Sequence, residues 1–213
     1  MRWLFWVSVA CTFAKQPLVA PPNDVTTVLL VTGTLGRPLD GIARHPWLAV
    51  RRKGAQMWQL YEVPSVATES DPFDRGHDYG NPILHAVWRG DEADRAADCI
   101  EHEAEPIIRD IDDHYIFYPG PNSNTFGDRI LRKCGLHASL PSTSIGKDWR
   151  GLIGAGVTSE GTGVQVETPI VGLKIGLKEG IELHVIGLSI GVDFWPPAII
   201  LPLGPGRLGF ADR

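Results

Sequence analysis

The sequence lacks an excess of positive charge, and this limits the classes of partner that the protein can bind. The chain has 20 lysine and arginine residues against 25 aspartate and glutamate residues, which gives a formal net charge of -5. A protein that holds nucleic acid needs a basic field against the phosphate backbone. We therefore expect no nucleic-acid partner and no attraction to anionic membrane surfaces.

Cysteine is also scarce, with only Cys11, Cys99 and Cys134. Three cysteines do not make a disulfide framework, although an oxidising compartment would permit one bridge between Cys99 and Cys134. Cys134 falls on the apolar stripe of its predicted helix, whereas Cys99 falls off the apolar face of its own. We therefore predict two unpaired thiols.

Long hydrophobic runs are missing, and the longest apolar run lies at residues 3–14, directly after Arg2. Its length is typical of a signal-peptide core and is too short to span a bilayer easily. We expect residues 1–20 to be a signal peptide or an N-terminal membrane anchor, so that the protein is exported and is periplasmic or tethered facing the periplasm. The alternative is a buried N-terminal strand or helix.

The hydrophobic content of 43% is enough for one ordinary core, and 24 glycines with 17 prolines predict many tight turns. Alternation and β-branched content predict strands at residues 25–32, 46–52 and 56–63, the last two joined as a hairpin around residues 53–55. Apolar residues at helical spacing predict a helix over 91–111, with a kink or break at Pro106, and a second helix that begins at Ser123 or Asn124 and ends at Cys134.

Beyond residue 150 the sequence changes to glycine-punctuated β segments. Residues 172–177 are echoed by residues 187–192, with a turn at 178–180 between them, which predicts hairpins. We therefore expect an α+β core over residues 24–150 and a β-rich extension of the same domain over residues 151–213.

Ser123 is the first candidate for chemistry because a rigid Pro-Gly-Pro corner precedes it and a predicted helix follows it. In one interpretation Ser123 or Asn122 simply caps the helix, which stabilises it by about 1 kcal/mol. In the other, Ser123 is a nucleophile at the positive end of the helix dipole, where backbone N–H groups stabilise an oxyanion. Asn122 and Asn124 would then supply another donor or contact the substrate.

A serine nucleophile needs a base, and His45 is the best placed histidine because it immediately precedes a predicted strand. A third polar group should orient the imidazole. A three-residue hairpin loop would put Gln59 and Tyr61 on the face of His45, whereas a four-residue loop would put Glu62 opposite it. We choose Glu62 as the third catalytic residue for its charge and keep Tyr61 as a substrate-binding candidate. We predict no metal site and no cofactor.

Three motifs carry a resemblance to a known family. They are the Tyr-Pro-Gly-Pro-Asn-Ser-Asn-Thr-Phe segment at 118–126, Ile-Gly-Lys-Asp at 145–148 and Glu-Gly-Ile-Glu at 179–182. From about residue 28 to residue 209 the chain resembles a bacterial family known as domain of unknown function 3750. That name implies no activity.

More distantly, the order of the motifs resembles circularly permuted papain-like proteins of the NlpC type, in which a strand histidine precedes an Asn-Cys-Asn-x-Phe helix start. His45 matches the histidine, and Ser123 stands in the place of the cysteine. The resemblance implies a papain-like antiparallel sheet packed on helices, and cleavage of amide bonds or acyl transfer on peptide or other cell-envelope material. Because serine replaces cysteine, a non-catalytic envelope-binding or structural domain is the alternative.

Overall fold

The computed structural model describes residues 18–39, 42–75, 79–204 and 206–210. The apolar run at residues 3–14 lies outside these residues, as does nearly all of the predicted signal peptide or anchor. Within the described ranges, no helix combines the length and the apolar character that a bilayer crossing requires.

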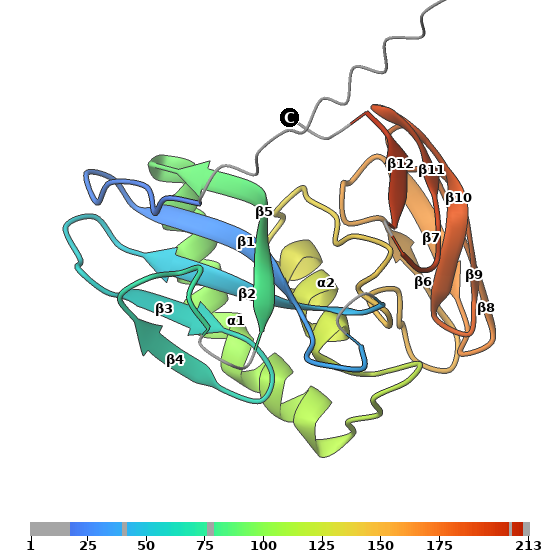
Figure 1. Ribbon diagram of the computed structural model, residues 1–213, viewed down its shortest axis with the longest axis horizontal. Helices are drawn as coiled ribbons and strands as arrows, with labels where there is room; N and C mark the ends of the chain where they lie inside the picture. Colours follow the sequence, from blue (N-terminus) through green and yellow to red (C-terminus); the bar gives the residue numbers. More distant parts are fainter. Residues whose placement is uncertain (1–17, 40–41, 76–78, 205, 211–213) are drawn as a thin grey trace, which may run out of the picture.

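The protein is a mixed α+β fold with two helices and two antiparallel sheets (Figure 1). The first sheet, sheet A, has the strand order β4-β3-β2-β1-β5. Its strands are β1 (Thr27–Thr34), β2 (Arg44–Arg51), β3 (Trp58–Tyr61), β4 (Val66–Glu69) and β5 (Gly80–Arg89). All of β1 is buried because it lies inside the sheet and both faces are covered, as its apolar run predicts.

The hairpin between β2 and β3 differs in its loop from both sequence-based alternatives. Leu48 pairs with Tyr61 and Val50 with Gln59, so the connection spans residues 52–57. Successive side chains of a strand point to opposite faces. This register puts Glu62 on the face of His45 and Tyr61 on the other face, where Tyr61 packs in the core below the helices.

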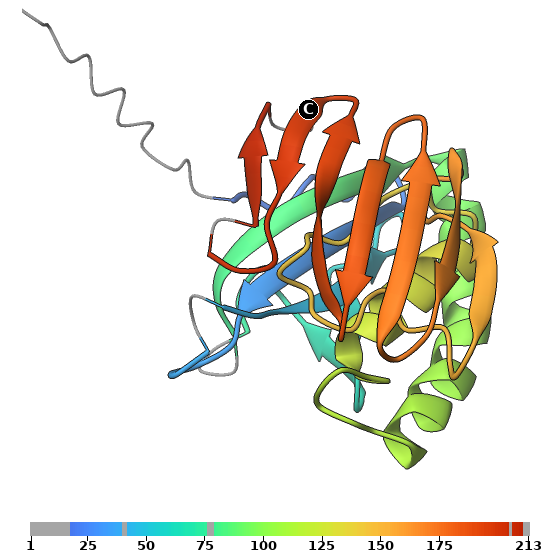
Figure 2. The same ribbon diagram turned by 90° about the vertical axis from the view of Figure 1, so that its right-hand side faces the viewer.

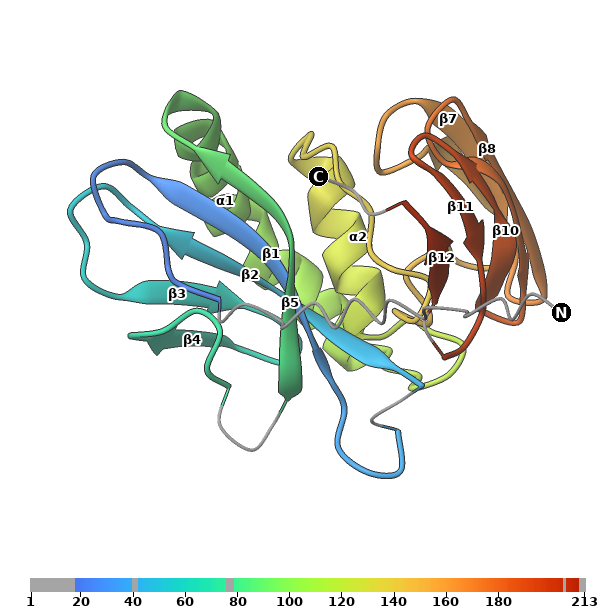
Figure 3. The same cartoon turned by 45° about the horizontal axis from the view of Figure 1, so that its top comes forward.

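Both helices lie on one face of sheet A (Figure 1). Helix α1 (Asp91–Asp113) buries the apolar stripe that its sequence predicts. Of the kink or break predicted at Pro106, the break does not occur, since the helix continues through Pro106. Ile107, Ile108 and Ile111 extend the buried stripe, as the unchanged phase of the pattern predicts. Helix α2 (Ser123–Lys133) begins at the predicted position and lies between sheet A and the second sheet (Figure 3).

The prediction of two unpaired thiols was wrong, since Cys99 of α1 is bonded to Cys134 at the end of α2 with a Cα–Cα distance of 5.6 Å. The helical stripe placed Cys99 off the face that packs on sheet A. Cys99 lies on the side of α1 that faces α2. A residue outside the stripe that packs on sheet A can therefore still lie between the two helices.

The second sheet, sheet B, is a meander with the order β12-β11-β10-β9-β8-β7-β6 (Figure 2). Its strands are β6 (Gly154–Val157), β7 (Gly163–Glu167), β8 (Val171–Gly176), β9 (Gly180–Val185), β10 (Leu188–Phe194), β11 (Pro197–Ile200) and β12 (Arg207–Gly209). The predicted hairpins are therefore present, and they form one continuous sheet stacked beyond α2.

Candidate functional site

A cavity of about 470 Å³ lies where β2 begins and α2 begins, and four of the predicted site residues line it: His45, Asn122, Ser123 and Asn124. The rest of its wall is largely apolar and aromatic, with Leu35, Leu39, Ile42, Val63, Tyr79, Tyr115, Phe117, Tyr118 and Ile145. Of the two other predicted site residues, Glu62 contacts His45 without lining the wall, and Tyr61 is turned into the core by the hairpin register. The structure thus brings the two motifs that carry His45 and Ser123 to one cavity.

His45 is held on two sides. Its Nε2 lies 2.8 Å from Oε2 of Glu62, and both side chains are buried. The other oxygen of Glu62 accepts a hydrogen bond from Arg75. The ring of Tyr79 stacks on the imidazole at 3.9 Å with an interplanar angle of 6°. A carboxylate on Nε2 fixes the orientation of the ring and stabilises its protonated form.

Asn122 is the N-cap of α2 and uses its whole amide group. Its Oδ1 accepts from the backbone N–H groups of Asn124 and Thr125. Oγ1 of Thr125 in turn accepts from the backbone N–H of Asn122, which completes a capping box. Its Nδ2 donates to the carbonyls of Phe117 and Ile145. Asn122 therefore has a structural role here, and its amide donors are already engaged rather than directed at a substrate oxyanion.

The Ile145-Gly146 segment is bound directly to the start of α2. Asn124 Nδ2 donates to the Ile145 carbonyl at 2.8 Å, and Thr125 Oγ1 donates to the Gly146 carbonyl at 2.8 Å. Gly146 has a φ of +91°, and a Cβ there would meet Asn122 Nδ2 at 2.5 Å, so this close passage requires glycine. The Ile-Gly-Lys-Asp motif at 145–148 thus supports the segment at 118–126 that begins α2.

Asn124 lines the cavity and keeps one amide oxygen buried in the protein. Its side chain is 6% exposed, and among the residues that the structure describes its Oδ1 has no hydrogen-bond partner. The amide orientation follows from the bond of Nδ2 to the Ile145 carbonyl, which only a donor can make. A buried acceptor without a partner costs free energy unless a bound group donates to it.

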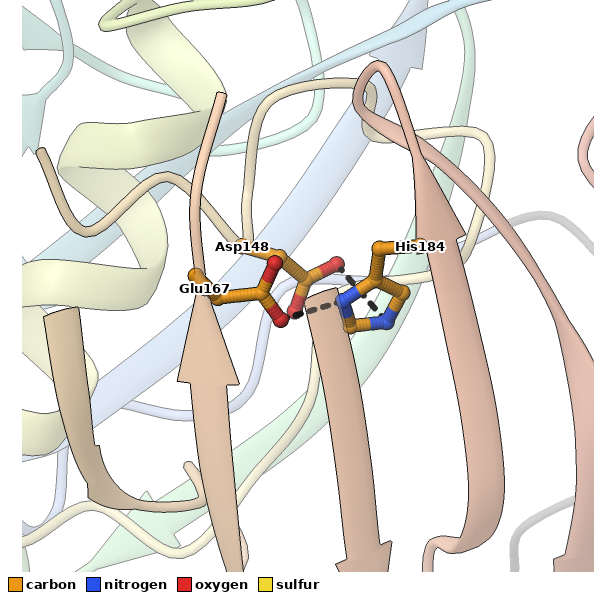
Figure 4. A group of neighbouring side chains, drawn as sticks. All are labelled: Asp148, Glu167 and His184. Atoms are coloured by element: carbon orange, nitrogen blue, oxygen red, sulfur yellow. Dashed lines mark hydrogen bonds and ion pairs between the residues drawn. The ribbon is translucent and has the colours of Figure 1, made fainter. Parts of the chain in front are cut away.

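A second polar cluster, which the sequence analysis missed, lies between sheet B and the Lys147-Asp148 pair that follows Gly146. Asp148, Glu167 of β7 and His184 of β9 converge there (Figure 4). His184 Nδ1 is 2.5 Å from Glu167 Oε1, and its Nε2 is 3.5 Å from Asp148 Oδ2. The signal was present in the sequence, because Gln165, Glu167, Lys174, Glu182 and His184 recur with period two and so share one face of sheet B.

The charges of this cluster balance only if His184 is protonated. Lys174 contacts both Asp148 (3.2 Å) and Glu182 (3.3 Å), and Lys147 contacts Asp148 at 2.6 Å. Burial alone would raise the pKa of Asp148, but the two ammonium groups hold it well below its usual range. Burial likewise opposes protonation of His184, yet Asp148 and the hydrogen bond to Glu167 raise the pKa of its imidazole. Three carboxylates thus face three cations.

Asp148, Glu167 and His184 are ligand types that bind a divalent metal, but their surroundings do not fit one. A metal ligand must be a neutral imidazole, whereas Asp148 and the hydrogen bond to Glu167 raise the pKa of His184 and so favour its charged form. Two ammonium groups already neutralise Asp148 and Glu182, and a dication would lie beside them. The arrangement is that of a buried ion-pair network that joins sheet B to the loop below α2.

Comparison with known proteins gave one match. The family described as "Protein of unknown function (DUF3750)" matches residues 28–149, which comprise sheet A, both helices and the Ile-Gly-Lys-Asp motif. The match stops before sheet B, so the resemblance expected as far as residue 209 is shown only over this part. No curated protein and no solved structure matched the chain. The match covers more than half of the sequence, and the chain belongs to the DUF3750 family.

Proposed function

We propose that this protein is an exported papain-like hydrolase or acyl transferase that acts on amide or ester bonds of cell-envelope material, with Ser123 as its nucleophile. One observation carries the proposal: Ser123, at the N-terminus of α2, and His45, hydrogen-bonded to Glu62, line the same cavity although 77 residues separate them in the chain. The elements that hold them, a helix start and an antiparallel strand, are those that the NlpC-type arrangement requires.

In this mechanism Ser123 Oγ attacks the substrate carbonyl carbon while Nδ1 of His45 takes the hydroxyl proton. Glu62 stabilises the imidazolium through Nε2. The first backbone N–H groups of α2 lie at the positive end of its dipole and stabilise the tetrahedral oxyanion. His45 then gives the proton to the leaving amine or alcohol, which releases it and leaves an acyl group on Ser123. Water or an acceptor nucleophile resolves the ester by the same steps in reverse.

The cavity wall indicates what the substrate looks like. Aromatic and aliphatic side chains favour an apolar acyl group or side chain. The Cys99–Cys134 disulfide supports an oxidising compartment outside the cytoplasm, where envelope material is found.

The test is covalent labelling with a fluorophosphonate probe of the wild type, Ser123→Ala, His45→Ala and Glu62→Gln. We expect labelling of the wild type, none of Ser123→Ala, and at least about a hundredfold slower labelling of His45→Ala, because general-base catalysis contributes roughly 10²- to 10⁴-fold. Ser139→Ala is the control, since Ser139 is bonded to Glu160 away from the cavity. Equal labelling of the wild type and Ser123→Ala would contradict a nucleophilic role.

Non-catalytic binding of the same apolar group is the second candidate, and burial favours it. Ser123 is 7% exposed and His45 is 4% exposed, so a substrate has little access to either in this conformation. In that case Ser123 is only the first residue of α2. The hydrogen bonds that join His45, Glu62 and Arg75 then support the cavity wall. Binding of a fluorescent fatty acyl amide that is unchanged in Ser123→Ala, together with absence of probe labelling, would favour this function.

A further inference from the structure

Sheet B has its polar face inside and its apolar face outside. Strand residues that point toward α2 include Gln165, Glu167, Lys174, Glu182 and His184, all of them buried. The opposite positions carry fourteen large apolar side chains, each 43–63% exposed. Figure 2 looks onto this outer face, and no described element covers it. A buried polar face with an exposed apolar one reverses the usual arrangement of a sheet that covers a core.

The apolar side chains lie in register across the strands. One row has a member on every strand from β7 to β12: Val164, Ile175, Ile181, Val192, Ile199 and Leu208. A parallel row runs through Val166, Leu173, Leu183 and Ile190. No outward-pointing position in these strands carries a charged side chain. The face is therefore one continuous aliphatic surface.

The extent of this face is that of a stable protein interface. Fourteen half-exposed side chains, at roughly 70–80 Å² each, present on the order of 1,000 Å² of apolar surface. The largest apolar patch of an ordinary monomer is about 300–600 Å². A standard interface buries about 800 Å² on each partner, and obligate homodimers have the most apolar interfaces.

We propose that this outer face of sheet B is a dimer interface, on which a second copy of the chain packs its own sheet B to form a β-sandwich. An uncharged aliphatic face is complementary to itself, which a two-fold symmetric contact requires. Aligned sheets pack about 10 Å apart with interdigitated side chains, and the ridges of β-branched residues suit this packing. Each copy then buries the face that its monomer exposes, and the cavity near Ser123 stays open because none of the described residues of sheet B lines it.

The charges of sheet B favour a second copy over a lipid surface. Arg207 pairs with Asp193 at 3.1 Å on the inner side of the sheet, and Lys178 in the β8–β9 turn lies 3.6 Å from Glu160. With a net charge of -5 and no charged side chain at the outward strand positions, the described part of this face lacks the basic ring that holds a protein on anionic lipid. Binding of this face to a lipid bilayer is therefore the alternative that the experiment must exclude.

The test is sedimentation equilibrium of the full chain, expressed from its first residue and purified as the host processes it. We expect twice the chain mass at concentrations of about 10 µM and above. Leu183→Lys should weaken the dimer at least about tenfold, because it puts a charge in the middle of the apolar rows. Val87→Lys is the matched control, since Val87 on β5 has the same 43% exposure as Leu183 but lies on sheet A.

Two further measurements complete the test. Hydroxyl-radical footprinting of the wild type should show Leu173, Leu183 and Ile190 protected at high protein concentration and oxidised at low concentration, which needs no variant to fold. Flotation with phosphatidylcholine vesicles, with and without phosphatidylglycerol, should leave the protein behind. A monomer at every concentration, an equal effect of Leu183→Lys and Val87→Lys, unchanged footprinting, or flotation of a monomer would each overturn the proposal.

Discussion

Asn122 stabilises the site through four hydrogen bonds from one side chain. Two cap α2, and two hold the carbonyls of Phe117 and Ile145. Replacing it by alanine removes the cap and leaves buried groups without partners, so we expect Asn122→Ala to lower the free energy of unfolding by about 2–3 kcal/mol. Urea denaturation measures this loss.

The control for this prediction is Asn23→Ala. Asn23 makes a single 3.4 Å bond to the Ala55 carbonyl in a partly buried turn, and its removal should cost less than about 0.5 kcal/mol. If Asn122→Ala is as stable as Asn23→Ala, the Asn122 side chain does not stabilise the protein through its bonds to Phe117 and Ile145.

At this scale the sequence predicted that the motifs of His45 and Ser123 lie near one another, but not what each of their residues does. His45, Ser123 and Asn124 reach the cavity because strand and helix starts can be recognised from local residues. The capping role of Asn122 was one of the two sequence-based interpretations. Its hydrogen bond to the Ile145 carbonyl, 23 positions away, is not encoded by any local pattern. Tyr79, which stacks on His45, was missed because it comes from a segment without a periodic signal.

Helices α1 and α2 are joined by the Cys99–Cys134 bond, whose partners are 35 residues apart. Closing a loop of this length in the unfolded chain raises the free energy of unfolding by about 3–4 kcal/mol in the chain-entropy account. We expect the double variant Cys99→Ser, Cys134→Ser to lose this amount, and reductant to lower the wild type to the same midpoint. Thermal or urea unfolding with and without reductant checks it.

The variant Cys11→Ser serves as the control for that pair, since Cys11 is not a partner in the bond. It should unfold like the wild type in both conditions. Equal stability of the oxidised and reduced wild type would contradict the prediction.

Sheet B illustrates what element-scale patterns can and cannot predict. Glycine-punctuated repeats identified its hairpins, and period-two alternation separates its residues into a polar and an apolar set. Alternation does not tell which set faces inward. The usual assumption, apolar inside, is wrong here because Lys174, Glu182 and His184 form an ion-pair network with Asp148 against the rest of the molecule.

The stability of the whole molecule depends on the ion-pair network around Asp148 and His184, because this network joins sheet B to the loop that supports α2. The pKa of His184 is raised in the folded protein by Asp148 and Glu167 despite its burial. A group with a raised folded pKa stabilises the fold fully below its unfolded value of 6.5, and this contribution is lost as the pH rises through the folded pKa. The acidic partners act in the opposite direction. Lys174 and Lys147 lower the pKa of Glu182 to about 2 against its burial, so its contribution is present above about pH 4.5 and is lost as the pH falls.

We therefore expect the free energy of unfolding to be greatest between about pH 4.5 and pH 6.5. It should fall at higher pH, the alkaline limb of the curve, as His184 loses its proton. Each unit by which the folded pKa exceeds the unfolded one contributes about 1.4 kcal/mol. In His184→Gln the side chain is uncharged at every pH, so this variant should be less stable than the wild type at low pH and should lose the alkaline limb. His102→Gln is the control, because His102 is on the exposed side of α1. Urea unfolding of the three proteins from about pH 4 to pH 9 separates them, and an alkaline limb that persists in His184→Gln would show that another group drives it.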